Sequence, residues 1–172
     1  MIKAIVYTSK TGTTEWYAKT LGEELNLPVF TFKEGKISLS KSDEIIYLGC
    51  IRADNISLLS EARSIFTTSI VIGVGLTATG GRMEEVRKAN SIDVSIPLFT
   101  LQGGFIPSRL HGIEKLILSL VVKSQRKNLK KKTNRTKDEE DMLSLLTNGG
   151  IRTTKDNLKA VIEECKRMEE KR

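Results

Sequence analysis

Ser9-Lys10-Thr11-Gly12-Thr13-Thr14 follows the apolar run Ile2–Tyr7 and precedes a helical pattern over Glu15–Leu25. This order predicts a first strand, a turn rich in hydroxyl groups and the start of a helix. Backbone N–H groups at a helix N-terminus point at an anion, the helix dipole favours negative charge there, and Ser and Thr hydroxyls add donors. Gly12 allows the backbone to approach such an anion closely. The stretch therefore predicts a phosphate site, and the alternative interpretation is a simple helix-capping turn.

Four more apolar runs predict strands that alternate with helices along the first hundred residues. These predicted strands cover Val29–Phe32, Glu44–Gly49, Ser69–Val74 and Ile96–Leu101, and two of the predicted helices cover Ser57–Thr67 and Met83–Ala89. Alternation of this kind requires parallel strands joined by right-handed crossovers, with helices on both faces of the sheet. Ligands of such α/β folds bind beyond the carboxyl ends of the strands, where the strand order reverses. A site is therefore expected in the loops after Tyr7, Gly49 and Val74.

The phosphate stretch resembles the Ser/Thr-x-Thr-Gly-x-Thr loop of flavodoxins, which holds the phosphate of FMN. Ser9, Thr11, Gly12 and Thr14 occupy the four specified positions. The resemblance implies a flavodoxin-like α/β fold, a three-layer sandwich around a five-stranded parallel sheet of order 2-1-3-4-5. It also implies that FMN is the cofactor and that the whole loop binds it, Lys10 and Thr13 included. The chain has neither the Walker A pattern nor a Gly-x-Gly-x-x-Gly turn, so FMN is expected rather than FAD.

Two further loops lie where flavodoxins contact the flavin ring. The first follows the third strand and comprises Cys50, Ile51, Arg52, Ala53, Asp54 and Asn55. The second follows the fourth strand, and its candidate contacts are Gly75, Leu76, Thr77, Ala78 and Gly80. The Ile-Arg pair and an insertion before the last helix are similar to the flavodoxin-domain family of the bacterial oxygen-independent protoporphyrinogen oxidase, whose loop reads Gly-x-Ser-Ile-Arg-Tyr-Gly. This chain departs from that loop at Cys50, Ala53 and Asp54.

The first of these loops indicates how the protein would influence a flavin. A cation at Arg52 near the ring would stabilise the negative charge of the reduced form, and the alternative is a solvated arginine. Asp54 and Asn55 tolerate the left-handed backbone that a turn here requires. Ala53 removes an aromatic cover that the resemblance would place over the ring. Cys50 is either a redox thiol or a small residue at the end of a strand.

The chain carries an insertion, predicted over residues 125–150 with a short helix, before its last helix. Arg126–Lys137 holds seven basic residues and no acidic one, which accounts for the whole net charge of +7. With Leu129 as its only aliphatic side chain, this segment is expected to be mobile and to dock an anionic partner. An acidic redox partner or the surface of an anionic membrane fits the charge. Nucleic acid is disfavoured because no aromatic residue is interleaved with the basic ones.

The segments around these charges predict helices. Ile113–Val122 is apolar nearly all round, so a well-buried helix is expected there. Thr136 and Glu139 fit a capping box that opens the short helix of the insertion. A final helix is expected from about Thr154 onward.

Size and composition fit one compact domain over residues 1–172, of which 39% are hydrophobic. No run reaches the roughly 18 to 20 apolar residues that cross a bilayer, and Met1–Val6 resembles a strand rather than a signal peptide. Cys50 and Cys165 form no Cys-x-x-Cys pair, which fits a soluble protein of the reducing cytoplasm. The single histidine, His111, excludes a His-pair metal site and is expected at the surface.

Together these features predict an FMN-binding, flavodoxin-like redox protein that transfers electrons to or from a partner protein or a small substrate. It would be an electron carrier or an FMN-dependent oxidoreductase, and the sequence assigns no catalytic residue. One alternative is a quinone-coupled dehydrogenase similar to protoporphyrinogen oxidase. The other is a binding module that kept the fold without the cofactor and docks an anionic partner.

Overall fold

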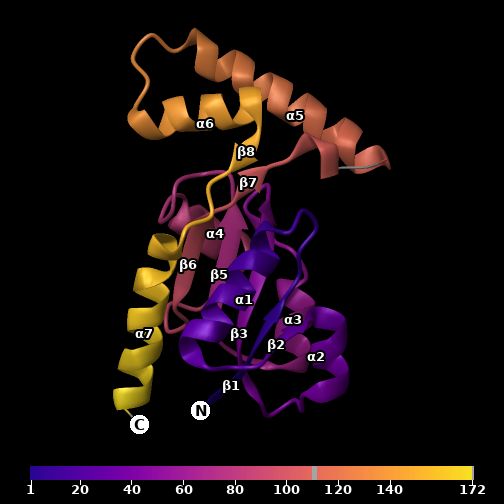
Figure 1. Cartoon of the computed structure of the whole chain (residues 1–172), viewed down its shortest axis with the longest axis vertical. Helices are drawn as coiled ribbons and strands as arrows, with labels where there is room; N and C mark the ends of the chain where they lie inside the picture. Colours follow the sequence, from indigo (N-terminus) through magenta and orange to yellow (C-terminus); the bar gives the residue numbers. More distant parts are fainter. Residues whose placement is uncertain (110–111, 172) are drawn as a thin grey trace.

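The computed structural model describes residues 1–109 and 112–171 and shows an α/β protein (Figure 1). His111, with its predicted surface position, lies outside the described residues. The strands are β1 (Ile2–Tyr7), β2 (Val29–Thr31), β3 (Glu44–Arg52), β4 (Asn55–Ile56), β5 (Thr67–Gly75), β6 (Leu98–Gln102), β7 (Gly104–Phe105) and β8 (Gly150–Ile151). The α-helices are α1 (Thr13–Leu25), α2 (Phe32–Ser38), α3 (Leu59–Ile65), α4 (Met83–Ala89), α5 (Gly112–Lys131), α6 (Lys137–Asn148) and α7 (Lys159–Glu170). Short 3₁₀ turns cover Pro107–Arg109 and Lys155–Leu158.

The main sheet runs in the order β2-β1-β3-β5-β6, and the neighbours along this path pair in parallel. This confirms the predicted parallel sheet and the crossovers that it requires. The predicted number of strands was wrong, because a sixth strand, β4, pairs antiparallel with β3. The order in chain numbering is therefore 2-1-3-5-6 and not 2-1-3-4-5. A strand of two residues is too short to leave a periodic signal in the sequence.

Helix α2 is a second element that the hydrophobic pattern did not predict. The apolar run Val29–Phe32 predicted a strand through Phe32, but the strand ends at Thr31 and the helix begins with Phe32. Thr31 and Glu34 form a capping box, in which Glu34 N–H donates to the Thr31 hydroxyl (3.3 Å) and Thr31 N–H donates to the Glu34 carboxylate (2.8 Å). Reciprocal bonds of this kind satisfy the first N–H groups of a helix and fix where it starts.

Two hydrophobic cores show that the sheet is the middle of three layers. Side chains alternate along β3, so that Ile46 and Leu48 face one core while Ile45 and Tyr47 face the other. Helices α1 and α7 cover the first core, and α3 and α4 cover the second. Cys165 of α7 is buried in the first core, where burial raises the pKa of its thiol to about 11. That thiol is therefore protonated at neutral pH and serves as a packing residue.

The insertion forms a separate layer at one end of the molecule (Figure 1). Strands β7 and β8 form its base, with Gly104 opposite Ile151 and Phe105 opposite Gly150. Helices α5 and α6 follow each other between these strands and pack around a third hydrophobic core that includes Val122, Leu145 and Leu146. The segment outside the sandwich is therefore residues 104–151, which is longer than the predicted 125–150.

Helix α5 differs from the prediction in two ways. The basic residues from Arg126 to Lys131, expected in a mobile segment, form the last turns of the helix. Leu129 packs in the third core, which the sequence could not show because the partner side chains lie on α6. Conversely, the expected buried helix over Ile113–Val122 is largely exposed, since Ile113 is 76% and Leu116 63% accessible to solvent. Helix α6 has 12 residues against 20 in α5, so it covers only part of the longer helix.

Within the described residues, no helix combines the length and the apolar character that crossing a membrane requires.

Candidate functional site

The loop between β1 and α1 presents backbone donors at the carboxyl edge of the sheet. Gly12 has φ of +94° and takes the N-cap position of α1, where no side chain caps the helix. The first backbone hydrogen bond of the helix is donated by Trp16 N–H to Gly12 O (3.0 Å). The N–H groups of residues 13 to 15 have no intrahelical acceptor, as expected for a helix N-terminus. Ser9 accepts a hydrogen bond from Gly12 N–H (3.1 Å) and so closes the loop.

The threonines of this loop differ in their surroundings. Thr13 and Thr14 are buried, with 8% and 1% of their surface exposed, whereas Thr11 is half-buried. Thr13 faces the neighbouring strand end, where its hydroxyl oxygen lies 3.2 Å from the position that a side chain at Gly103 would occupy. Lys10 is exposed at the tip of the loop. Thr13 therefore packs against the fold, and Thr11 is the more accessible hydroxyl.

Arg109 lies against this loop, although 98 residues separate it from Thr11. Its Nη1 donates to Thr11 O (2.5 Å), and the same nitrogen lies 3.0 Å from the position that a Cβ at Gly12 would take. The 3₁₀ turn Pro107–Arg109 at the base of the insertion brings the guanidinium there. Sequence reasoning missed Arg109, because no local pattern connects the two segments.

The loop between β3 and β4 is a two-residue hairpin turn. Ala53 and Asp54 both have a left-handed backbone, with φ of +46° and +64°. The left-handed conformation was predicted correctly for Asp54, but Ala53 and not Asn55 supplies the other turn residue. The Asn55 side chain instead donates to Ala53 O (2.9 Å). Paired left-handed residues fit the right-handed twist of the flanking strands.

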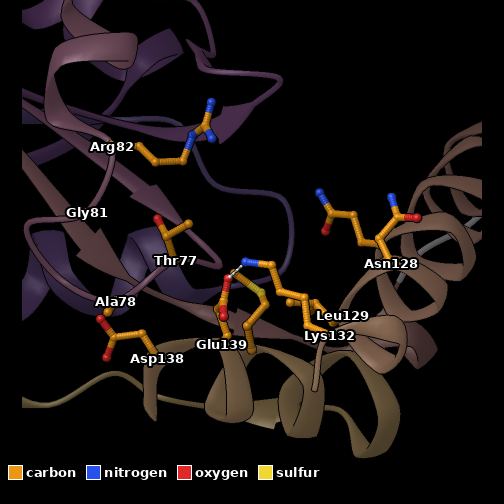
Figure 2. A pocket seen from close by; sticks show the side chains of 11 residues that line it. Thr77, Ala78, Gly81, Arg82, Asn128, Leu129, Lys132, Asp138 and Glu139 are labelled. Carbon is orange, nitrogen blue, oxygen red and sulfur yellow. Dashed lines mark hydrogen bonds and ion pairs between the residues drawn. The ribbon is translucent and has the colours of Figure 1, made fainter. Parts of the chain in front are cut away.

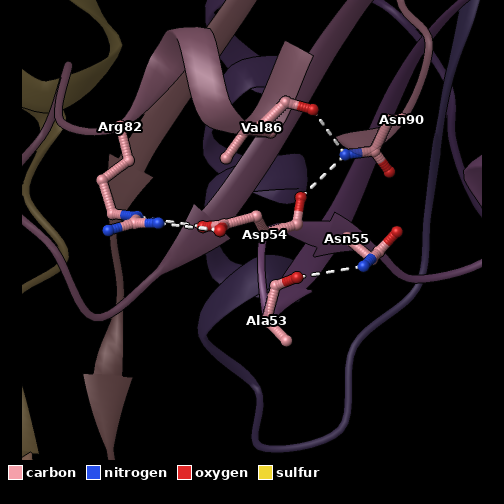
Figure 3. Close-up of polar contacts among 6 residues, drawn as sticks. All are labelled: Ala53, Asp54, Asn55, Arg82, Val86 and Asn90. Carbon is pink, nitrogen blue, oxygen red and sulfur yellow. Dashed lines mark hydrogen bonds and ion pairs between the residues drawn. The ribbon is translucent and has the colours of Figure 1, made fainter. Parts of the chain in front are cut away.

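A salt bridge joins this turn to the loop after β5 (Figure 3). Arg82 donates from Nε to one oxygen of Asp54 (2.9 Å) and from Nη2 to the other (2.7 Å). Asn90 fastens the same turn by donating from Nδ2 to Asp54 O (2.8 Å) and to Val86 O (2.7 Å), and by accepting from Ile56 N–H (2.8 Å). The two loops predicted to flank a flavin ring are thus fixed relative to each other.

This salt bridge predicts a pH dependence of stability. The Arg82 guanidinium beside Asp54 lowers the pKa of that carboxyl. A carboxyl with a lowered folded pKa stabilises the fold above its unfolded pKa of about 3.9, and this contribution disappears as the pH falls through the folded value. Asp54→Asn should therefore lower the free energy of unfolding at pH 7 by up to about 1 kcal/mol, because the pair is partly exposed. Urea unfolding should show this difference shrinking below about pH 4.

The exposed Glu84 on α4 provides the control for this measurement. Glu84→Gln removes one negative charge close to the same loop without touching the salt bridge. An equal loss of stability in both variants at pH 7 would mean that the Arg82–Asp54 pair contributes nothing specific.

The remaining residues of the β3 loop have distinct places. Ile51 packs over β5, since its Cδ1 lies 2.7 Å from where a Cβ at Gly73 would stand. The absence of a side chain at Gly73 therefore makes room for Ile51, whereas a Cβ at Gly75 would lie at an ordinary contact distance of 3.4 Å from it. Cys50 Sγ lies 3.0 Å from the Ser57 hydroxyl, whereas the other free cysteine, Cys165, is buried in the first core. Arg52 is exposed at the end of β3, and its proposed effect on a flavin stays a prediction.

The loop after β5 is attached firmly to β6. Gly80 N–H donates to Thr100 O (2.9 Å), and the Thr100 hydroxyl donates to Gly81 O (2.9 Å). Gly80 has φ of +81°, so a turn residue without a side chain suits this position. Leu76 is partly buried and packs against the core of the insertion. Of the predicted ring contacts, Ile51 and Leu76 therefore both pack against hydrophobic cores.

A pocket of about 470 Å³ lies between this loop and the insertion (Figure 2). Thr77, Ala78, Gly81 and Arg82 line it from the side of the sandwich, and residues of α5 and α6 line it from the other side. Lys132 and Glu139 also line the pocket, and the Lys132 ammonium forms a salt bridge with the Glu139 carboxylate. Sequence reasoning did not predict this pocket, because its walls come from segments about 50 residues apart.

A chain of hydrogen bonds holds the insertion against the sandwich. Asp141 of α6 accepts from Gln102 Nε2 (2.8 Å) and from Arg152 Nε (3.0 Å). Gln102 O in turn accepts from the Tyr17 hydroxyl (2.6 Å), which accepts from Asn157 Nδ2 (2.6 Å). Burial raises the pKa of Asp141, but the bonds from Arg152 and Gln102 outweigh it, and the net pKa is lowered. Asp141 is therefore charged at neutral pH and anchors the wall of the pocket.

The structure thus brings three predicted loops to one edge of the sheet, because the strands that precede them run in parallel. Among the described residues, no cluster of three or more His, Cys, Asp or Glu side chains could hold a metal ion. Comparison of the chain with protein-family models, curated proteins and solved structures finds no match.

Proposed function

We propose that this protein binds FMN without a covalent link and transfers electrons to or from a partner protein or a small substrate. The observation that carries the proposal is the N-terminus of α1. It directly follows the loop after the parallel strand β1, no side chain caps it, and Gly12 at the N-cap has a left-handed conformation. The strand order reverses between β1 and β3, and the loops that follow β3 and β5 lie at the same edge of the sheet as the loop after β1. Ligands of a flavodoxin-like fold bind at such a reversal. FMN supplies the redox chemistry when bound, and the protein supplies position and electric field.

The residues of the first loop fit a phosphate group. The N–H groups of residues 13 to 15 are donors that have no acceptor within the helix. The half-buried Thr11, just before the helix, adds a hydroxyl donor. Gly12 leaves open the space that a side chain would fill, and Arg109 stands at its border. One phosphate can be satisfied here, which favours a mononucleotide over a dinucleotide.

The other loops supply the remaining parts of the proposal. Arg52 and the Ala53–Asp54 turn would lie at one side of the ring, and Thr77 and Ala78 at the other. The pocket of about 470 Å³ beside Thr77 and Ala78 would receive the second reactant. Its apolar side chains, Leu129 and Met142, and its amides, Gln125 and Asn128, suit a small organic molecule better than an ion.

Identification of the bound cofactor tests the proposal directly. Protein purified without added flavin should be yellow, and the small molecule released by denaturation should run with FMN on HPLC. Colourless protein that also fails to bind added FMN would overturn the proposal and favour the cofactor-free binding module.

Arg109 provides a sharper prediction. Charge-assisted hydrogen bonds contribute about 1.5 to 3 kcal/mol each, and about 1.4 kcal/mol corresponds to tenfold in affinity. Apoprotein should therefore bind FMN at least about 100-fold more tightly than riboflavin, which lacks the phosphate. Arg109→Gln should weaken FMN binding by about tenfold and leave riboflavin binding unchanged, as measured by titration of flavin fluorescence. Equal weakening for both flavins would show that Arg109 acts on the fold and not on the phosphate.

A further inference from the structure

Helix α5 exposes one continuous stripe of side chains. Residues 113, 116, 120, 123, 127 and 130 recur at alternating spacings of three and four, which places them on one face of a helix. The first three are apolar and highly exposed, Ile113 at 76% and Leu116 and Leu120 at 63% each. The last three are the exposed lysines Lys123, Lys127 and Lys130. The stripe therefore changes from apolar to basic halfway along the helix.

This stripe faces away from the rest of the molecule. The opposite face of α5 carries Leu118, Val122 and Leu129, which pack in the core of the insertion. The pocket is lined by Gln125, Asn128 and Leu129, which lie on the packed side of α5 and outside the stripe. Figure 1 shows α5 as the outer helix at the end of the molecule, so the sandwich does not obstruct an extended surface that approaches it.

The charges of the stripe are not neutralised by the insertion itself. Two of the four acidic residues of α6 form salt bridges with other residues, Glu139 with Lys132 and Asp141 with Arg152. In the described part of the chain, no salt bridge involves the three lysines of the stripe. The basic half therefore keeps its attraction for an external anionic surface.

We propose that this stripe docks the protein on the surface of an anionic lipid bilayer. The apolar half enters the boundary between headgroups and acyl chains, and the lysines reach the lipid phosphates. Each half extends over about 10 Å of helix, so a modest tilt of α5 serves both contacts. Docking does not depend on FMN, since no residue of the stripe belongs to the proposed cofactor site.

Other occupants match the stripe less well. A coiled coil requires apolar side chains at the positions where its helices face each other. If a partner helix or α5 of a second copy packed along the stripe, three successive positions of this kind would be lysines. Parallel copies would also oppose like charges. An acidic protein would match the lysines, but Ile113, Leu116 and Leu120 would need a shaped apolar groove, whereas a bilayer accepts a convex ridge of any shape.

Vesicle sedimentation tests this proposal with the full-length protein. At low salt the protein should sediment with vesicles of equal parts phosphatidylcholine and phosphatidylglycerol and stay in solution with phosphatidylcholine alone. Leu116→Gln with Leu120→Gln should weaken binding to the anionic vesicles by at least about tenfold. Lys123→Gln, Lys127→Gln and Lys130→Gln together should weaken it to a similar extent and reduce its salt dependence.

Matched controls exist on the sandwich. Ile37 and Val94 are 87% and 88% exposed, so Ile37→Gln with Val94→Gln removes as much exposed apolar surface elsewhere. Lys33→Gln, Lys41→Gln and Lys88→Gln remove three exposed positive charges elsewhere. Both controls should bind vesicles like the parent protein, and circular dichroism melting should show that all variants remain folded.

Three results would overturn the proposal. The first is parent protein that does not bind anionic vesicles at low salt, as expected if the stripe serves an acidic protein. The second is binding that the leucine and lysine variants retain, or that the controls lose equally. The third is a dimer in sedimentation velocity that the leucine variant dissociates, which would assign the stripe to a second copy of the chain.

Discussion

Gly12→Val is expected to weaken FMN binding by at least about 100-fold while the protein stays folded. Gly12 has φ of +94°, a conformation in which a β-branched residue is strongly strained. A side chain here would also meet Arg109 Nη1 at 3.0 Å. The loop must therefore change shape and turn its N–H groups away from the phosphate, which removes two or more charge-assisted bonds of about 1.5 to 3 kcal/mol each. Titration of the apoprotein with FMN measures the loss.

Asn26→Val provides the matched control for this strain. Asn26 has φ of +52° and ends the same helix, α1, on the far side from the loop. Urea unfolding should show that both variants lose about 1 to 2 kcal/mol of stability, the approximate cost of a left-handed residue with a Cβ. Only the Gly12 variant should lose FMN affinity. Equal FMN affinity in Gly12→Val and the parent protein would exclude this loop as the phosphate site.

The sequence was sufficient to predict the elements that have a strong periodic pattern. Continuous apolar runs such as Ile45–Leu48 are typical of strands buried on both faces, and the structure confirms them in the middle of the sheet. Helix α2 and strand β4 were missed for different reasons. The start of α2 depends on the Thr31–Glu34 capping box within an apolar run, and β4 exists only because the turn at Ala53 and Asp54 returns the chain onto β3.

The candidate site was predictable where one continuous segment forms it. The loop from Ser9 to Thr14 carries its own signal, since hydroxyl residues, a glycine and a helix start follow one another. Contacts between distant segments carry no such signal. Arg109 at the first loop and Arg82 at Asp54 depend on how the insertion and α4 approach the sheet, which only the folded chain determines.

Helix α5 shows how a composition argument can fail. Its first half is apolar on nearly every side, a pattern that is typical of a buried helix. Burial, however, requires a neighbour, and α6 is too short to cover Ile113 and Leu116. For the basic half, the prediction erred in the opposite direction, because its charge suggested a mobile segment. In the structure Leu129 packs against the third core, and Arg135 Nη1 donates a hydrogen bond to Leu129 O (3.2 Å).

Removal of the insertion is expected to leave a folded sandwich that no longer binds anionic vesicles. Phe105 and Gly150 are opposite each other in the β7–β8 pair, so an Asn-Gly turn can replace residues 106–149 and close the hairpin. Phe105→Thr and Leu76→Ser should accompany the deletion, because both side chains pack in the core that is removed. The two cores on the faces of the main sheet contain no residue of α5 or α6 and should remain intact.

The shortened protein should still unfold cooperatively in urea, with a far-UV circular dichroism signal reduced by the loss of α5 and α6. FMN binding should persist and weaken by about tenfold, because Arg109 and its charge-assisted bond leave with the insertion. Binding to anionic vesicles should disappear, since the whole stripe of α5 is absent. A shortened protein that is molten or aggregated would mean that the bonds of Asp141 to Gln102 and Arg152 support the sandwich itself. A folded one that keeps full vesicle affinity would move the lipid-binding surface from α5 to the sandwich.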